Sequence, residues 1–218
     1  MITDKRTSSR AEANLVMTQA SDRPPNLYEL LHELRGIRVC LRPYAVGDGV
    51  VVQEAIEESR DHLRPWMAWT DSRRTVQECK AYIRQALGQW LTQEDVTVGM
   101  WDCSTDRYVG GIWLYPTDWR VPAIAIGYWV RASAQGHGFV TEGVMLLCKL
   151  AFLTFAAQRV SIQCEAANPR SANIPRRLGF VHEATLRNHS RNTMGELTDT
   201  LIFALTPDDY SQLPCSQT

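Results

Sequence analysis

The sequence predicts one mixed α/β domain in which antiparallel strands are combined with a strand–helix–strand unit. Three features indicate this fold. Strands separated by turn-forming residues come first, a strongly apolar helix then joins two further strands, and a short helix precedes a closing hairpin. A doubly wound parallel sheet would require a more regular alternation of strands and helices.

The individual elements follow from apolar periodicity and from capping and turn residues. Asp48 is the expected N-cap of one helix, and residues 104–106 are the expected turn between two strands. We expect strands at 37–41, 96–101, 108–115, 123–130, 160–165, 180–186 and 197–205, and helices after Asp48 and at 75–91, 141–156 and 171–178.

The chain divides into four parts. Residues 1–25 are polar and end in two prolines, which predicts a disordered or extended arm. Residues 26–36 carry leucines at helical spacing and end at Gly36, which predicts a short helix that either docks onto the domain or binds a partner. Residues 37–210 form the expected domain, and 211–218 form a tail.

The composition excludes several classes of protein. Because 23 Lys and Arg nearly balance 24 Asp and Glu, no global basic field exists to bind nucleic acid directly. The longest apolar run is interrupted at Lys149, and no apolar stretch follows the basic residues of the N-terminus, so we expect neither a membrane span nor a signal peptide. A cytoplasmic protein without membrane partners is therefore expected, either a monomer or a homodimer.

The cysteines predict neither a zinc site nor a disulfide framework. They are widely scattered and no two form a C-x-x-C pair. We expect reduced thiols at Cys40, Cys79, Cys103, Cys148, Cys164 and Cys215.

A glycine-containing loop between a strand and a helix predicts a phosphate site, because glycines allow an anion to approach the backbone N–H groups at a helix N-terminus. The loop residues are Gln135, Gly136, His137, Gly138, Phe139, Val140 and Thr141. A dinucleotide fingerprint would need glycine in place of Thr141, and a P-loop would need lysine in place of Val144. A tight turn without a ligand stays open as the alternative.

Three segments resemble the GNAT superfamily of acyl-CoA N-acetyltransferases. Residues 135–140 resemble its pyrophosphate loop Q/R-x-x-G-x-G/A, although Val140 stands where Gly or Ala is usual. Residues 126–130 resemble a strand of the RimJ/RimL type, and residues 168–180 are similar to the family's N-x-x-S…L-G-F segment. The resemblance covers residues 37–206.

The resemblance implies a GNAT fold, with a mostly antiparallel sheet splayed at a central parallel pair and helices on both faces. Strand 123–130 would end at a bulge and diverge from 160–165, and the pantetheine arm of acetyl-CoA would enter there. Besides residues 135–141, the cofactor contacts it implies are Tyr128, Trp129, Val130, Asn168 and Ser171. Ser171 would also protonate the CoA thiolate, although it equally fits a helix N-cap.

The resemblance also implies roles for a base, for acceptor-binding residues and for a histidine of the loop. Glu183 matches a glutamate that acts as general base in RimJ/RimL-type proteins, or it is an exposed strand carboxylate. Trp66 and Trp69 would border the acceptor groove or anchor a helix. Asp199 would hold an acceptor amine or orient the backbone. His137 would lie near CoA phosphate.

The implied activity is acetyl transfer from acetyl-CoA to an amine through a tetrahedral intermediate, with no metal. The expected acceptor is the α-amine of a protein N-terminus or of an aminoacyl-type compound. Two alternatives stay open: an acetyltransferase of a small-molecule amine such as an antibiotic, polyamine or toxin, and a non-catalytic acyl-CoA-binding module.

Overall fold

The protein is described by a computed structural model that covers residues 33–92, 96–118 and 120–213. Its centre is one 8-stranded sheet with the strand order β1-β2-β3-β4-β5-β6-β8-β7. The strands are β1 (Leu34–Arg35), β2 (Val39–Arg42), β3 (Val96–Asp102), β4 (Tyr108–Asp118), β5 (Ala123–Val130), β6 (Arg159–Glu165), β7 (Val181–Arg191) and β8 (Leu197–Leu205). The helices are η1 (Val46–Asp48), α2 (Gly49–Leu63), η2 (Ala68–Thr70), α3 (Val76–Thr92), η3 (Ala132–Ala134), α4 (Phe139–Leu153), α5 (Pro169–Arg177) and α6 (Pro207–Ser211).

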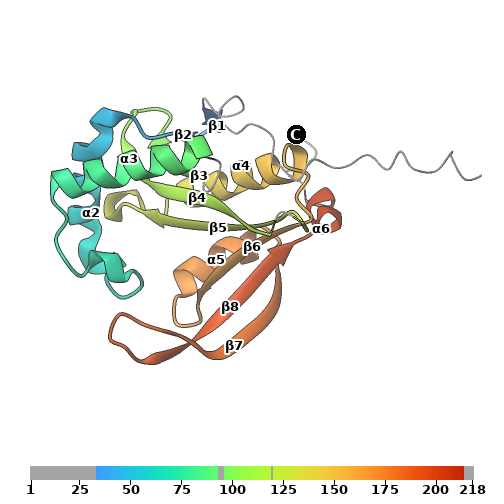
Figure 1. The fold of residues 1–218 in the computed structure, drawn as a ribbon. Helices are drawn as coiled ribbons and strands as arrows, with labels where there is room; N and C mark the ends of the chain where they lie inside the picture. The colour runs from blue at the N-terminus through green and yellow to red at the C-terminus, as the bar shows by residue number, and fades with distance from the viewer. Residues whose placement is uncertain (1–32, 93–95, 119, 214–218) are drawn as a thin grey trace, which may run out of the picture.

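Helices cover both faces of the sheet, with α2 and α3 on one side and α4 on the other (Figure 1). β5 and β6 are parallel, whereas the other neighbouring strands pair antiparallel. The fold class expected from the sequence is confirmed.

Two apolar cores lie on the two faces because successive side chains of a strand point in opposite directions. On β2, Val39 and Leu41 join the core beneath α4, whereas Cys40 joins the core beneath α2 and α3. On β5, Ile126 faces α4 and Trp129 faces α2 and α3. Strand β5 therefore borders both cores.

Local signals explain where the elements begin. Helix α3 starts at a capping box, in which the Glu78 N–H donates to Thr75 Oγ1 at 3.2 Å and the Thr75 N–H donates to Glu78 Oε2 at 2.7 Å. The turn between β3 and β4 is closed by Asp102, which accepts from the Ser104 N–H at 2.9 Å. Both boundaries lie within two residues of their expected places.

The short helix expected over residues 26–36 is wrong at its end. Leu34 and Arg35 form β1 and pair with Leu41 and Cys40 of β2. The Gly36 N–H donates to Val39 O at 2.9 Å, which closes a tight turn between the two strands. The open edge of β2 offers backbone partners that leucine spacing does not reveal. The rest of that helix and the expected arm lie outside the described residues.

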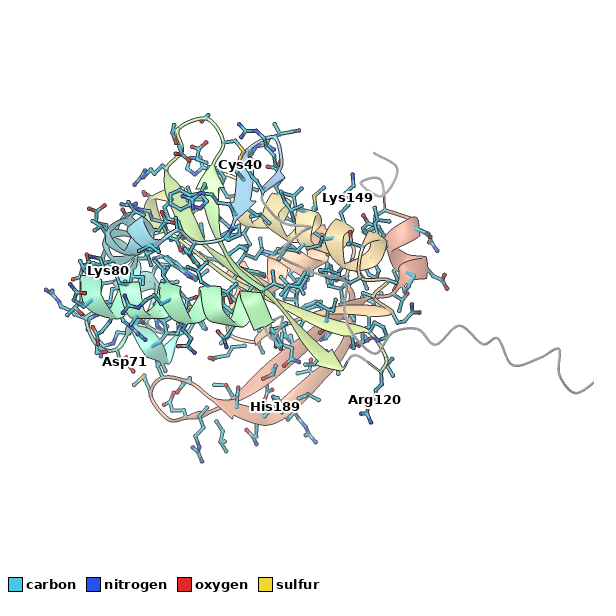
Figure 2. All side chains as sticks on the ribbon, turned by 45° about the horizontal axis from the view of Figure 1, so that its top comes forward. Cys40, Asp71, Lys80, Arg120, Lys149 and His189 are labelled. Carbon is cyan, nitrogen blue, oxygen red and sulfur yellow. A yellow bond between two sulfur atoms is a disulfide. The ribbon has the colours of Figure 1, made fainter. Side chains whose placement is uncertain are left out.

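The expectation of reduced thiols is also wrong for two cysteines. Cys40 and Cys103 form a disulfide, with their Cα atoms 5.5 Å apart (Figure 2). They lie 63 residues apart in sequence. The pairing of β2 with β3, which sets Val39 opposite Asp102, brings them together. Cys79, Cys148 and Cys164 are free thiols.

Among the helices that the structure describes, none has the length and apolar character needed to cross a bilayer.

Candidate active site

The two parallel strands separate before they end. β5 and β6 pair at three positions, of which the last joins Ala125 to Ser161. Beyond that point β5 stays paired with β4 through Val130, and β6 stays paired with β8 through Glu165. A wedge therefore opens between residues 126–130 and 162–165, as the resemblance implied.

The backbone of β5 presents hydrogen-bonding groups to this wedge. The Arg131 N–H donates to Val109 O of β4 at 2.7 Å, and no register shift is recorded between there and Pro116. Because successive residues of a strand turn their backbone groups to opposite neighbours, Tyr128 and Val130 turn theirs to the wedge. The expected bulge at the end of β5 is therefore wrong. The wedge opens because β6 leaves with β8.

The wedge-facing carbonyl of Val130 has a partner from α2. His62 Nε2 lies 3.1 Å from Val130 O, so this nitrogen carries the proton and donates it. Burial lowers the pKa of His62, which favours the neutral ring. His62 thus ties the end of β5 to α2, a contact that its sequence position did not indicate.

The glycine loop has a backbone geometry that suits an anion. Gly136 and Gly138 have φ of 77° and 84°, a left-handed conformation that favours glycine, and Gly138 is the N-cap of α4. A Cβ at Gly136 would meet no atom within 4 Å, so the space beside the loop is open. The first N–H groups of α4 have no partner within the helix and face the region beside the loop.

The two side chains that follow Gly138 are packed into the apolar core. Phe139 and Val140 are 9% and 8% exposed and belong to the core beneath α4. Only their backbone N–H groups are left to meet a ligand, so the valine at 140 does not block an anion. The exposed ring of His137 lies 6.1 Å from that of Phe139.

A carboxylate holds the segment that leads into the loop. Glu58 of α2 accepts from Arg131 Nε at 2.5 Å and from the Ser133 N–H at 2.9 Å. Although burial raises the pKa of Glu58, these hydrogen bonds outweigh it and lower the pKa to about 2. The loop is therefore fixed from α2 before any ligand binds.

Two arginines lie beside the loop. Arg38 is exposed, and its Cδ would lie 3.8 Å from a Cβ placed at Gly138. Arg170 Nη1 donates to Gln135 Oε1 at 2.8 Å, which joins the start of α5 to the loop. Their charges complement a diphosphate. Neither arginine was predicted from the sequence, because neither lies within the loop.

The start of α5 differs from the expected one. Asn168 is the N-cap, and its Oδ1 accepts from the Ser171 N–H at 3.0 Å. Pro169 occupies the first helical position, which its fixed φ favours. The expected alternative of Ser171 as the N-cap is wrong, so its hydroxyl is free for another role.

That hydroxyl meets strand β5 across the wedge. Tyr128 Oη lies 3.3 Å from Ser171 Oγ and donates to Ser171 O at 3.1 Å. Burial raises the pKa of Tyr128 well above its ordinary value, so its hydroxyl stays protonated near neutral pH. The structure thus brings together two residues that the sequence assigned to one site.

The end of β6 adds two ionisable groups. Burial raises the pKa of Cys164, and a hydrogen bond with Ser171 opposes that effect. Burial also raises the pKa of Glu165, the last residue of β6. Alternation along the strand places Glu165 on the face opposite Ile162, which is the face of α2 and α3. Glu165 was not predicted from the sequence, because a strand-terminal glutamate has no distinctive motif.

Glu183 is not brought to the wedge. Its carboxylate accepts two hydrogen bonds from Arg159, the longer 2.7 Å. These bonds lower the pKa of Glu183 and make it a weaker base. Arg159 lies at the closed end of the parallel pair, five residues from Cys164, which is about 17 Å along the strand. His182 lies beside the Phe203 ring.

The remaining expected residues are divided between two regions. Asp199 Oδ1 accepts from the Asn188 N–H at 2.9 Å, so it orients the backbone of β7. The Trp69 ring lies 6.0 Å from the Trp129 ring and lines a cavity between α2, α3 and the sheet. Trp66, which follows α2, is not among the described residues that line this cavity.

Comparison with known families accounts for this geometry. A family model described as "Acetyltransferase (GNAT) domain" matches residues 38–181, more than half of the chain. The chain is 26% identical over 179 residues to "Probable N-acetyltransferase YjcK" of Bacillus subtilis, which covers 81% of this chain and 98% of the relative.

Two solved structures share the fold. The microcin C7 self immunity acetyltransferase MccE, in complex with acetyl-CoA and AMP, superposes with a TM-score of 0.73 at 20% identity, covering 78% of this chain and 93% of the other. The ribosomal L7/L12 α-N-protein acetyltransferase RimL, in complex with coenzyme A, superposes with a TM-score of 0.72 at 16% identity, covering 80% and 97%.

Proposed function

The chain belongs to the GNAT acetyltransferase family, and on that premise we propose that it acetylates an α-amine, on a protein N-terminus or on an aminoacyl-type compound. The broader activity follows from the family itself. The chain is an enzyme that transfers an acetyl group to an amine, and acetyl-CoA is its co-substrate. The observation that supports acetyl-CoA as co-substrate is the glycine loop at the start of α4, beside the open wedge, and the observation that carries the choice of acceptor is the single carboxylate, Glu165, at the end of β6.

The residues around the loop and the wedge suit the parts of acetyl-CoA. The N–H groups of residues 136–141, with Arg38 and Arg170 beside them, would hold the diphosphate. The wedge-facing carbonyl of Tyr128 and the amide of Asn168, whose NH₂ group can still donate, would hold the amides of the pantetheine arm.

Three groups would carry the acetyl transfer. The wedge-facing N–H of Tyr128 would donate to the oxyanion that forms when the amine attacks the thioester. Ser171 would donate its hydroxyl proton to the departing thiolate and regain a proton from water. Tyr128 Oη, 3.3 Å away, would stabilise the serine oxygen by turning its single proton from Ser171 O to that oxygen. Glu165, whose raised pKa suits a general base, would accept the proton lost by the amine.

The preference for an α-amine rests on proton availability. Near pH 7 about a tenth of α-amino groups are already neutral, against well under roughly a thousandth of lysine side chains. A single, half-buried carboxylate such as Glu165 therefore suffices for an α-amine. The likeness to an α-N-protein acetyltransferase agrees with this preference.

The second candidate function, acetylation of a small-molecule amine outside the aminoacyl class, is favoured by the cavity that Trp69 and Trp129 line, because a cavity of this kind suits a small ligand. The likeness to a self immunity acetyltransferase solved with AMP points the same way.

The test compares two peptides of one sequence, one with a free N-terminus and acetylated lysine, the other with a blocked N-terminus and free lysine. We expect CoA release only with the free N-terminus over pH 6.5–9, the range in which α-amines lose their proton. Equal or faster acetylation of the lysine peptide would contradict the proposal. A cytoplasmic location, and a monomeric or homodimeric state, stay predictions from the sequence.

A further inference from the structure

A hollow among the described residues lies on the face of the sheet that α2 and α3 cover. It is a cavity of about 330 Å³ between α2, α3 and strands β3 to β5. In Figure 2, Lys80 marks α3 and Asp71 marks the loop that precedes it. Half of the lining residues are aromatic, namely Tyr44, Trp69, Tyr82, Tyr108, Trp113 and Trp129.

Glycines on the sheet make room for this aromatic lining. A Cβ at Gly111 would lie 2.7 Å from Trp129 Nε1, and a Cβ at Gly127 would overlap the Trp113 ring. The two indole rings therefore lie directly against the strand backbone, where any larger residue would displace them. Because the two indole rings lie close to the sheet, the space between the rings and α3 is left open.

The polar groups of the lining are mostly engaged with one another. Tyr44 Oη and Tyr108 Oη are 3.0 Å apart and both side chains are buried. Arg74 is the charged residue of the lining, and its Nε donates to Trp69 O at 3.4 Å. None of the described residues that line the cavity is acidic. A cationic chain such as that of lysine or a polyamine has no counter-charge there, whereas an apolar ring matches the aromatic lining.

The cavity lies next to the wedge. Trp129 lines the cavity, and its neighbours Tyr128 and Val130 turn their backbone groups to the wedge. Because the Trp129 side chain and the wedge-facing backbone groups belong to adjacent residues of β5, a group in the cavity and an amine in the wedge can be joined by a short linkage. An α-amine and a ring on its own β-carbon are joined in this way.

We propose that the cavity binds the aromatic side chain of the acceptor, so that the substrate is an α-amine whose own side chain is an aromatic ring. This inference rests on the proposed function. The volume of about 330 Å³ is more than twice that of an apolar cavity of about 150 Å³ that binds benzene, so a phenyl or an indole group fits. Two sources supply this chemistry: the first residue of a peptide, and a free aminoacyl compound.

The test measures kcat/KM for peptides that differ only in residue 1, which is Ala, Leu, Phe or Trp. We expect Phe and Trp to exceed Ala by about 10- to 100-fold, from the burial of a ring, and to exceed Leu as well. Phenylalanine amide, as a free aminoacyl compound, is assayed in parallel. Whichever of the peptide and the amide has the higher kcat/KM identifies the source.

Two variants check that the cavity is responsible. Trp69→Ala removes one wall and Cys79→Phe fills the space, so both should lower the Phe/Ala ratio of kcat/KM at least about fivefold. The ratio is its own control, because general damage to the enzyme lowers both rates. Trp66→Ala should leave the ratio unchanged, because this side chain does not line the cavity. If Cys79→Phe fails to fold, Trp69→Ala alone decides.

Two negative results have different meanings. Free α-amines that are all acetylated at equal rates, or a Phe/Ala ratio that is insensitive to Trp69→Ala, would overturn the aromatic inference and leave the proposed function standing. Acetylation of lysine peptides in preference to every free N-terminus would overturn the proposed function itself.

Discussion

The hydroxyl of Tyr128 donates to the backbone carbonyl of Ser171 at 3.1 Å and lies 3.3 Å from its hydroxyl oxygen. These contacts join strand β5 to the first turn of α5 directly across the open end of the parallel pair. The Ser171 backbone is also held by its N–H bond to Asn168. A serine fixed from two sides has a defined hydroxyl position, which proton transfer requires.

Ser171→Ala should therefore slow the chemical step more than it weakens cofactor binding. We expect kcat to fall roughly 100-fold, within the range of general acid catalysis, and the Kd for acetyl-CoA to change less than about threefold. Stopped-flow measurement of CoA release and calorimetric titration provide the two numbers. A kcat equal to that of the wild type would show that the hydroxyl has no part in the reaction.

The control for this variant follows from the capping geometry. Because Asn168 is the N-cap, Ser171→Ala should leave the melting temperature nearly unchanged, whereas Asn168→Ala should cost about 1 kcal/mol. Tyr128→Phe keeps the ring and removes the hydroxyl. It should reduce kcat less than Ser171→Ala does, because it removes only the partner of the proton donor.

Local sequence patterns predicted part of the proposed site. The residues that these patterns did not indicate are positioned by contacts between segments that lie far apart in the sequence. Gly136 and Gly138 were predicted because a glycine turn before a helix is local in sequence, whereas Asn168 was implied by the family resemblance of residues 168–180. The family resemblance pointed to Glu183 as the base, and we propose Glu165 instead, because the carboxylate of Glu183 is bonded to a partner 24 residues away, Arg159. No spacing rule reveals which glutamate an arginine neutralises.

Gly138→Val should abolish tight binding of acetyl-CoA. A β-branched residue is strained at a φ of 84°, and its side chain would stand where an anion approaches the N-terminus of α4. We expect the Kd to rise at least about tenfold, with loss of the melting-temperature increase that acetyl-CoA confers.

Gly195→Val is the matched control, because Gly195 has a φ of 82° and a Cβ there would meet no atom within 4 Å. It lies between β7 and β8 and carries the same backbone strain. Both variants should lose similar stability, about 1–2 kcal/mol, but only Gly138→Val should lose binding. Equal loss of binding in both would assign the effect to strain alone.

The errors about the fold have the same physical origin as those about the site. The pairing of Leu34 with Leu41, and of Cys40 with Cys103, depends on which strand edges meet. Apolar periodicity identified most strands, including 123–130 with both of its ends, because the burial of strand side chains selects apolar residues at regular positions. Apolar periodicity does not indicate the strand order β6-β8-β7, from which the wedge arises.

The disulfide should stabilise the domain. A bridge between residues 63 apart restricts the unfolded chain by about 4 kcal/mol in the chain-entropy model. We expect Cys103→Ser to lower the melting temperature by roughly 10 °C, because a domain of this size loses about 2–4 °C per kcal/mol. Dithiothreitol should lower the melting temperature of the wild type by a similar amount and leave the variant unaffected. Equal melting temperatures with and without the reductant would refute the prediction.

Glu165→Gln should remove the acidic limb of the pH–rate profile. Burial raises the pKa of Glu165, so the wild-type kcat/KM should rise with pH as this carboxyl ionises above its ordinary value. The variant should be slower by about 10² and lack that limb. The α-amine of the substrate adds a limb of its own at about pH 7.7–8.0 in both proteins. If the more acidic limb persists in Glu165→Gln, that titration belongs to another group.

Glu183→Gln makes the same chemical change at the closed end of the parallel pair. The pH dependence of the free energy of unfolding distinguishes the two glutamates. The folded protein holds a proton on Glu165 at higher pH than the unfolded chain does, so the wild type loses stability as pH rises from the ordinary glutamate pKa through the raised one. Glu165→Gln should flatten that decline.

The hydrogen bonds from Arg159 lower the pKa of Glu183, so this pair stabilises the fold above the ordinary pKa and its contribution is lost as pH falls through the lowered one. Both side chains of the pair are more than a third exposed, at 35% and 37%, so Glu183→Gln should cost less than about 1 kcal/mol near neutral pH. Urea unfolding between pH 3 and 8, with kcat/KM at each pH, measures both effects. If Glu183→Gln slows acetyl transfer as much as Glu165→Gln does, the general base is not Glu165 alone and the geometry of the wedge does not select it.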